Sequence, residues 1–242
     1  MQNPYYYCSA ENMAFDPAKR SAKALAACQA EHAPMDLRLW AHNHLANLDG
    51  LTPTQEAVLK AVFVLDVDHG GAPYRHSRYD AGNTGTPCDL IYRGQRMLKA
   101  DADGNTHCAG ATYAAFIGAL ERMGDAAVFT TGDVAALRKY FFVSTPDATA
   151  GIAKGIMMFA PRTDWAIQAH PDGLQVGDFA QLCHDDGVVQ HSFVCCGDVM
   201  CWSGADDAAV PGYLVWSSNY ATGLGFDFFR KAGRLFRAGR LA

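Results

Sequence analysis

The hydrophobic pattern of the chain changes its period part-way along the sequence. In the first part, apolar residues recur at helical spacing in several segments, including residues 33–48, 52–65 and 108–123. In the C-terminal half, short runs rich in Val, Phe, Tyr and Trp are separated by turns of Gly, Asp and Pro. Helices followed by short strands of this kind predict an α+β fold with an antiparallel sheet.

Two of the predicted helices carry end signals. Thr52 precedes Pro53 and an apolar run, which is typical of an N-cap followed by the first helical position. Gly70 is expected to end this helix, and Gly124 is expected to end the helix over residues 108–123. The ends of both helices are therefore predicted from local residue types.

Three parts of the chain differ in composition. Residues 1–50 are alanine-rich and predict a helical N-terminal extension, and residues 51–229 carry the mixed pattern of the main domain. Residues 230–242 hold five Lys or Arg residues and are interpreted as a solvated basic tail, with a weak membrane or partner contact as the alternative. Within the main domain, the polar residues 72–107 predict a long surface excursion with one short strand.

Charge and hydropathy restrict the class of function. The 242 residues carry a net charge of −5, so the basic surface that general nucleic-acid binding requires is not expected. No segment approaches the roughly 20 uninterrupted apolar residues of a membrane helix, so stable membrane insertion is not expected either. The first residues do not resemble a secretory signal, which predicts a cytoplasmic protein or a secreted effector exported without a cleaved signal peptide.

Cys108 has a setting that the other seven cysteines do not share. It follows a polar turn and opens a helical pattern, with Asn105 or Thr106 as the expected N-cap. The N–H groups of a first helical turn lower the pKa of a thiol and stabilise an oxyanion. Cys108 is therefore predicted to be a nucleophile, and the alternative is a reduced cysteine buried for packing.

A cysteine nucleophile needs a base, and His191 is the first choice. It lies on an otherwise apolar strand face, where an imidazole needs partners for its ring nitrogens. The alternative is a hydrogen-bonded histidine of the core. Asn219, on the following strand, is predicted to orient the imidazole, with Ser217 and Asp178 as the alternatives.

Metal binding is the competing interpretation of five residues in the C-terminal half. Cys183, His184, Cys195, Cys196 and Cys201 are residue types that zinc prefers. Their spacing is not a paired Cys-x-x-Cys arrangement, and neighbouring cysteines fall on opposite faces of a strand. We therefore predict no metal and no other cofactor.

Four motifs follow one another along residues 55–226: a helix leading into "GGAPY", a cysteine opening "CAGATYAAFIGAL", "VGDFAQL" before a strand, and His191 in the next strand. In this order they resemble the NlpC-type papain-like cysteine peptidases and their CHAP amidase relatives. The resemblance implies a papain-like fold in which the helix of Cys108 packs against the sheet of His191. It also implies that Gly71 and Tyr74 line the site near the oxyanion.

The function that the resemblance implies is hydrolysis of an amide bond in peptidoglycan stem peptides, through a Cys-His-Asn triad and an acyl-enzyme. The chain departs from the family where His107 precedes the cysteine and Ala109 and Gly110 follow it, since the family has Asp before it and Ser-Gly after it. The long interval from Tyr74 to Cys108 predicts a lid or specificity loop. The alternatives are an inactive papain-like binding module and an acyl or amide transferase.

Overall fold

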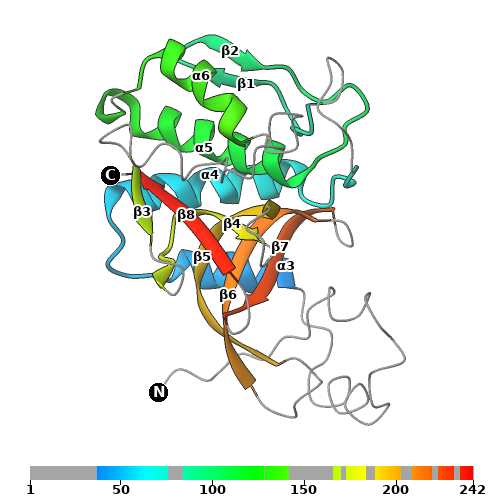
Figure 1. Ribbon diagram of the computed structural model, residues 1–242, viewed down its shortest axis with the longest axis vertical. Coiled ribbons are helices and arrows are strands. Elements are labelled where there is room, and N and C mark those ends of the chain that lie inside the picture. Colours follow the sequence, from blue (N-terminus) through cyan, green and yellow to red (C-terminus); the bar gives the residue numbers. More distant parts are fainter. Residues whose placement is uncertain are drawn as a thin grey trace.

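The computed structural model of the 242-residue chain is a mixed α+β structure with one large antiparallel sheet (Figure 1). The residues that it describes are 37–75, 84–127, 129–141, 166–169, 173–183, 189–202, 209–219, 223–231 and 235–241. The α+β class predicted from the change of period is therefore confirmed.

The described helices are α3 (Leu37–Ala46), α4 (Pro53–His69), α5 (Cys108–Met123) and α6 (Thr131–Phe141), with a 3-10 turn η2 (Gly124–Ala126). Helix α4 begins with a capping box, in which Thr52 and Gln55 each accept a hydrogen bond from the other's backbone N–H. Helices α4 and α5 end at Gly70 and Gly124, as predicted. None of the described helices has the length and apolar character that crossing a membrane requires.

The described strands of the large sheet are β3 (Ala166–Ala169), β4 (Phe179–Cys183), β5 (Val189–Trp202), β6 (Ala209–Asn219), β7 (Gly223–Arg230) and β8 (Leu235–Leu241). Their order is β3-β8-β4-β5-β6-β7, and all neighbouring pairs are antiparallel. A separate hairpin of β1 (Leu90–Tyr92) and β2 (Gln95–Leu98) lies on the side of α5 away from the sheet (Figure 1).

Helix α5 forms the centre of the main hydrophobic core. Its side chains from Ala109 to Ile117 are buried, and the helix packs against α4, β1 and β5. On the sheet, Val194 and Trp216 belong to this core, whereas Phe193 belongs to a second core on the opposite face. Because side chains alternate along a strand, the even-numbered residues of β5 from 192 to 196 face the helices and the odd-numbered ones face away.

The predicted basic tail is part of the sheet, so that interpretation is wrong. Strand β8 lies between β3 and β4 and pairs with both. Arg240 donates two hydrogen bonds to the fully buried Asp178, at 2.6 and 2.8 Å. The positive charge of Arg240 therefore neutralises a buried carboxylate instead of facing solvent. The local sequence does not show this, because Asp178 lies far away along the chain.

The described part of the predicted N-terminal extension, residues 1–50, is helical and packs on the main domain. Helix α3 contacts β7, and its residues Trp40, Ala41 and Leu45 belong to the main core. Residues 1–36 lie outside the described part of the chain. In the predicted excursion, residues 76–83 are likewise outside it, and the rest holds the β1–β2 hairpin instead of one strand.

Candidate active site

A buried aspartate fixes the loop that leads into α5. The carboxylate of Asp101 accepts hydrogen bonds from the N–H groups of Gly85 at 3.2 Å, Asp103 at 3.1 Å and Asn105 at 3.2 Å. The N–H of Asp101 donates in turn to the carbonyl of Thr86 at 3.0 Å. These bonds hold the segment around Gly85 against the turn before the helix.

His107 caps α5, so the predictions of Asn105 and Thr106 as the cap are wrong. Its Nδ1 accepts a hydrogen bond from the N–H of Gly110 at 3.1 Å. A Cβ at Gly85 would lie 1.9 Å from the His107 ring, and a Cβ at Gly110 would lie 2.1 Å from the Gly85 carbonyl oxygen. Both close approaches therefore require glycine. The Nδ1 lone pair of His107 is occupied by the helix backbone.

The segment that carries Gly71 and Tyr74 lies beside this loop. Tyr74 pairs with Thr106 in a parallel bridge, and the N–H of Thr106 donates to the carbonyl of Pro73 at 2.8 Å. On the other side of the segment, the N–H of Gly71 donates to the carbonyl of Leu224 at 2.8 Å. The segment therefore lies between the loop before α5 and the start of β7.

The sulfur of Cys108 lies at the N-terminus of α5, in contact with β5. The N–H groups of Ser192 and Ala109 and the hydroxyl of Ser192 lie where they favour the thiolate form of this sulfur. Burial raises the pKa of the Cys108 thiol above its ordinary value, and these donors offset the effect of burial only in part. The N–H groups at the helix terminus lower this pKa as expected, but desolvation outweighs them, so the net pKa of the thiol is raised.

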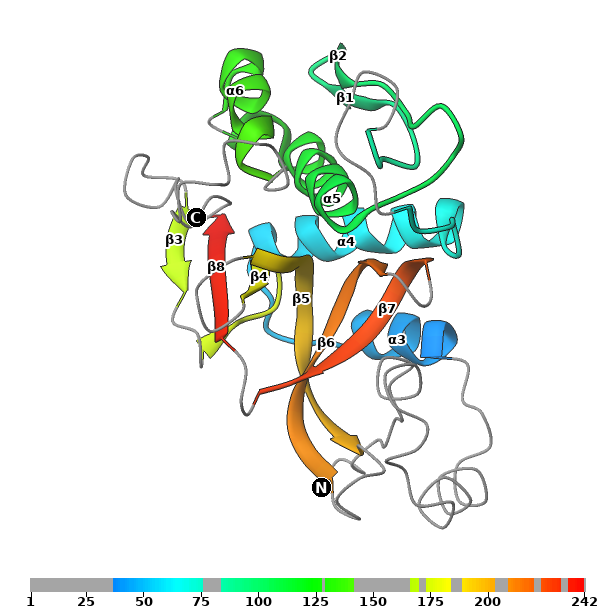
Figure 2. The same cartoon turned by 45° about the vertical axis from the view of Figure 1, so that its right-hand side comes forward.

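Strands β5 and β6 separate at this contact (Figure 2). Their paired residues extend as far as Val194 and Trp216, while β6 continues to its end paired with β7. Beyond that pair, the carbonyl of Ser192 accepts from the hydroxyl of Ser217 at 2.5 Å, and its N–H donates to the sulfur of Cys108. The side chains of Ser217 and Cys108 are therefore the partners of the Ser192 backbone where β6 no longer pairs with β5.

The loop before α5 also contacts β6. The side-chain oxygens of Thr106 and Ser218 lie 2.6 Å apart, and both residues are buried. The N-terminus of α5 is thus held between β5, at Ser192, and β6, at Ser218.

His191 directly precedes Ser192, but its ring lies on the other side of the sheet. Its ring centroid is 6.5 Å from that of Phe193 and 5.6 Å from that of Phe229, and both phenylalanines belong to the core facing away from α5. A β-bulge in the β4–β5 pairing adjoins His191. The structure brings Cys108 to the residue after His191, and a hydrogen bond between Cys108 and the His191 ring stays a prediction.

The three candidates for the orienting residue have different surroundings. Asn219 is buried at the end of β6, and its amide donates to the carboxylate of Asp227. Because Val215 faces the second core, Ser217 and Asn219 face the same side of β6 by alternation. Asp178 is held in its ion pair with β8. Ser217 and Asn219 therefore share a sheet side with the His191 ring.

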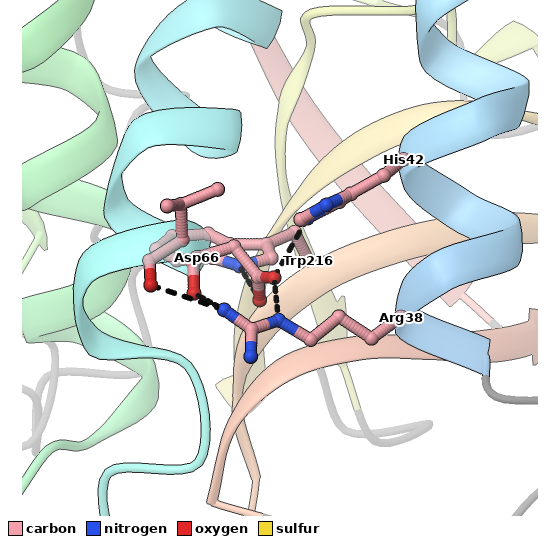
Figure 3. Close-up of polar contacts among 5 residues, drawn as sticks. Arg38, His42, Asp66 and Trp216 are labelled. Carbon is pink, nitrogen blue, oxygen red and sulfur yellow. Dashed lines mark hydrogen bonds and ion pairs between the residues drawn. The ribbon is translucent and has the colours of Figure 1, made fainter.

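A second buried polar cluster joins α3, α4 and the sheet (Figure 3). Asp66 of α4 is fully buried, and its Oδ2 accepts from Nε of Arg38 at 2.7 Å and lies 2.8 Å from Nε2 of His42. Its Oδ1 accepts from the indole N–H of Trp216 at 3.2 Å. Partners on two other elements therefore satisfy both oxygens, so the cluster fastens α3 and α4 to β6.

Sequence reasoning missed this cluster. The pattern of α3 alone indicates a surface or capping role for His42. The available signal was Asp66, a carboxylate that directly follows the apolar residues 61–65 on a helix with a buried face. A charge in that position needs partners, because an unpaired buried carboxylate is strongly unfavourable.

The cysteines weighed as zinc ligands lie apart where the structure describes them. Cys195 belongs to the core facing away from α5 and Cys196 to the core facing the helices, as the alternation predicts. The side chains of Cys183, His184 and Cys201 lie outside the described part. Among the described residues, no group of three or more His, Cys, Asp or Glu residues is placed to hold a metal ion.

Comparison of the chain with protein-family models, with curated proteins and with solved structures gives no match.

Proposed function

We propose that the chain is a cysteine hydrolase with a papain-like fold of the NlpC type, which cleaves an amide bond with Cys108 as the nucleophile. The observation that carries the proposal is the position of Cys108 at the first residue of α5, where the helix contacts β5 and where donors from both elements favour the thiolate, one residue from His191. The helix N-terminus and the small side chain of Ala109 suit a site where an oxyanion forms.

In the proposed reaction, His191 removes the thiol proton of Cys108, and the sulfur attacks the carbonyl carbon of the amide. The N–H of Cys108, with the segment of Gly71 and Tyr74, stabilises the negative charge on the carbonyl oxygen. His191 then protonates the leaving amine as the C–N bond breaks, which leaves a thioester. Water hydrolyses the thioester, releasing the carboxylate and restoring the thiol.

This reaction requires the His191 ring to leave Phe193 and Phe229 and to face Cys108. His191 is half-buried, and the β-bulge beside it is a feature that re-aims side chains next to active sites in other proteins. Asn219, at the end of the neighbouring strand, is the proposed orienting residue. The proposal therefore depends most on the His191 ring reaching the Cys108 sulfur.

The proposed substrate is a peptide amide in the stem peptides of bacterial peptidoglycan, and its support is the resemblance of the four motifs along residues 55–226. No cofactor is proposed, because a thiol and an imidazole supply both the nucleophile and the proton transfers. Action in the cytoplasm or after export is part of the same proposal.

A papain-like binding module without turnover is the second candidate, and two observations favour it. The raised pKa keeps the Cys108 thiol protonated at neutral pH in the absence of a base, and the His191 ring packs on the other side of the sheet. A transferase would use the same acyl-enzyme with an amine acceptor in place of water.

Digestion of purified muropeptides, followed by mass spectrometry, tests the proposal. The parent protein is expected to generate fragments with a new amine and a new carboxylate, and Cys108→Ala is expected to generate none. Cys88→Ala, which removes another half-buried thiol, is the matched control and should behave like the parent. Equal fragment profiles from the parent and Cys108→Ala would reject the hydrolase, and retained binding by both would identify the binding module.

A further inference from the structure

Ser192 occupies an unusual place on β5. It is buried, and its side chain is directed to the same side as Val194, towards the helices. Its backbone carbonyl is taken by the hydroxyl of Ser217, and its backbone N–H is taken by the sulfur of Cys108. Both backbone groups are therefore satisfied by side chains where β6 has left β5.

The hydroxyl of Ser192 has a second neighbour that fixes its direction. Gln181, its partner across the β4–β5 pair, is buried and donates from its side-chain Nε2 to the Ser192 oxygen at 3.4 Å. A hydroxyl that accepts a hydrogen bond in this way keeps its own hydrogen for another acceptor. That acceptor is the sulfur of Cys108.

We propose that Ser192 is the positioning residue of Cys108, which holds the sulfur at the separation of β5 and β6 and stabilises its thiolate through one backbone and one hydroxyl donor. The inference deepens the proposed function and rests on it for its catalytic meaning. Gln181 acts one step further away by orienting the hydroxyl. Hydrogen bonds to a charged group are the stronger ones, so loss of the hydroxyl alone is measurable.

The test is the pH dependence of iodoacetamide alkylation, followed on the Cys108 peptide by mass spectrometry. Removing the hydroxyl with Ser192→Ala is expected to slow alkylation about tenfold at a fixed pH below the midpoint, a shift of about one pH unit upward. Ser192→Thr keeps the hydroxyl and should restore the parent profile. With His191→Ala present, so that Ser217 cannot act by orienting the histidine, Ser217→Ala removes the hydroxyl that contacts the Ser192 carbonyl and should leave the midpoint unchanged.

The same series is repeated with His191→Ala present in every chain, so that no effect can arise through the proposed base. A shift by Ser192→Ala in both series, rescued by threonine, supports the positioning role even if muropeptide digestion rejects the hydrolase. An unchanged midpoint in Ser192→Ala overturns the inference. Equal shifts in Ser192→Ala and Ser217→Ala also overturn it, because a general loosening of β5 would then explain both. Circular dichroism confirms that each variant is folded.

Discussion

Burial has the same electrostatic effect on the half-buried Cys108 and on the fully buried Cys195 and Cys196. Burial raises the pKa values of Cys108, Cys195 and Cys196 above the ordinary thiol value of 9.0. A thiol with a raised pKa keeps its proton in the folded state at a pH where the unfolded chain has lost it. The free energy of unfolding therefore falls as the pH rises above the ordinary thiol pKa.

The expected loss is about 1.4 kcal/mol per thiol at one pH unit above the ordinary value, because one pKa unit corresponds to that free energy. Urea unfolding under reducing conditions at about pH 7.5 and about pH 10 measures it. The double variant Cys195→Ala with Cys196→Ala should lose less stability over this interval than the parent. An equal loss in both chains would show that the buried thiols do not cause the pH dependence.

For single residues, the sequence predicted that Cys108 begins a helix, but it did not predict that His107 caps that helix. Asn105 and Thr106 are common cap residues, but the N–H of Asn105 is used by Asp101 and the hydroxyl of Thr106 contacts Ser218. His107 caps the helix because its ring fits against a glycine that is distant in the sequence. Long-range contacts of this kind leave no local signal.

At the scale of elements, the ends of the helices were predictable and the C-terminal strand was not. Thr52 and the glycines at the helix ends act within a few residues, so their effect is visible in the sequence. Strand β8 carries two basic residues, Arg237 and Arg240, within seven positions, and the acidic partner of Arg240, Asp178, lies 62 positions earlier. Because this partner is so distant in the sequence, the partial burial of Arg240 could not be predicted from the local pattern.

Replacing Arg240 by alanine is expected to reduce the free energy of unfolding by about 3–5 kcal/mol, because it leaves the Asp178 carboxylate buried without its cation. Burial raises the pKa of Asp178, and Arg240 partly opposes this effect. Without Arg240 the pKa should rise further. The loss should therefore shrink as the pH falls and Asp178 takes up a proton. Urea unfolding at several pH values measures both effects.

Arg96→Ala is the matched control, since it breaks the exposed pair with Asp89 and should leave the urea midpoint near that of the parent. If Arg240→Ala is as stable as the control at neutral pH, then β8 does not depend on this buried pair.

At the scale of the whole molecule, the cluster around Asp66 connects elements that are far apart in the chain. Replacing Asp66 by alanine is expected to reduce the free energy of unfolding by about 2–3 kcal/mol, because the buried indole N–H of Trp216 loses its acceptor and Arg38 and His42 lose theirs. Urea unfolding at neutral pH measures this change.

Asp125→Ala removes an exposed carboxylate from the turn after α5 and is the control for the loss of one negative charge. Equal urea midpoints for the two variants would show that the cluster around Asp66 does not fasten α3 and α4 to the sheet.

The relative position of Cys108 and His191 also depends on how α5 packs against the sheet. Sequence alternation predicts that Val189, His191 and Phe193 lie on one face of β5, and the structure confirms that His191 and Phe193 share it. Both faces of β5 are buried in hydrophobic cores, so the hydrophobic pattern does not indicate which face meets α5. Sequence reasoning therefore found the strand and the helix but not the relation between the two side chains.

Labelling of Cys108 by an epoxide of the papain-inhibitor type at neutral pH tests whether His191 takes the thiol proton. If His191 takes the thiol proton, the parent should be labelled rapidly on the Cys108 peptide, and His191→Ala should lose that labelling because burial alone keeps the thiol protonated. Equal slow labelling of Cys108 in both chains, at the rate of Cys88, would show that His191 does not take the thiol proton of Cys108.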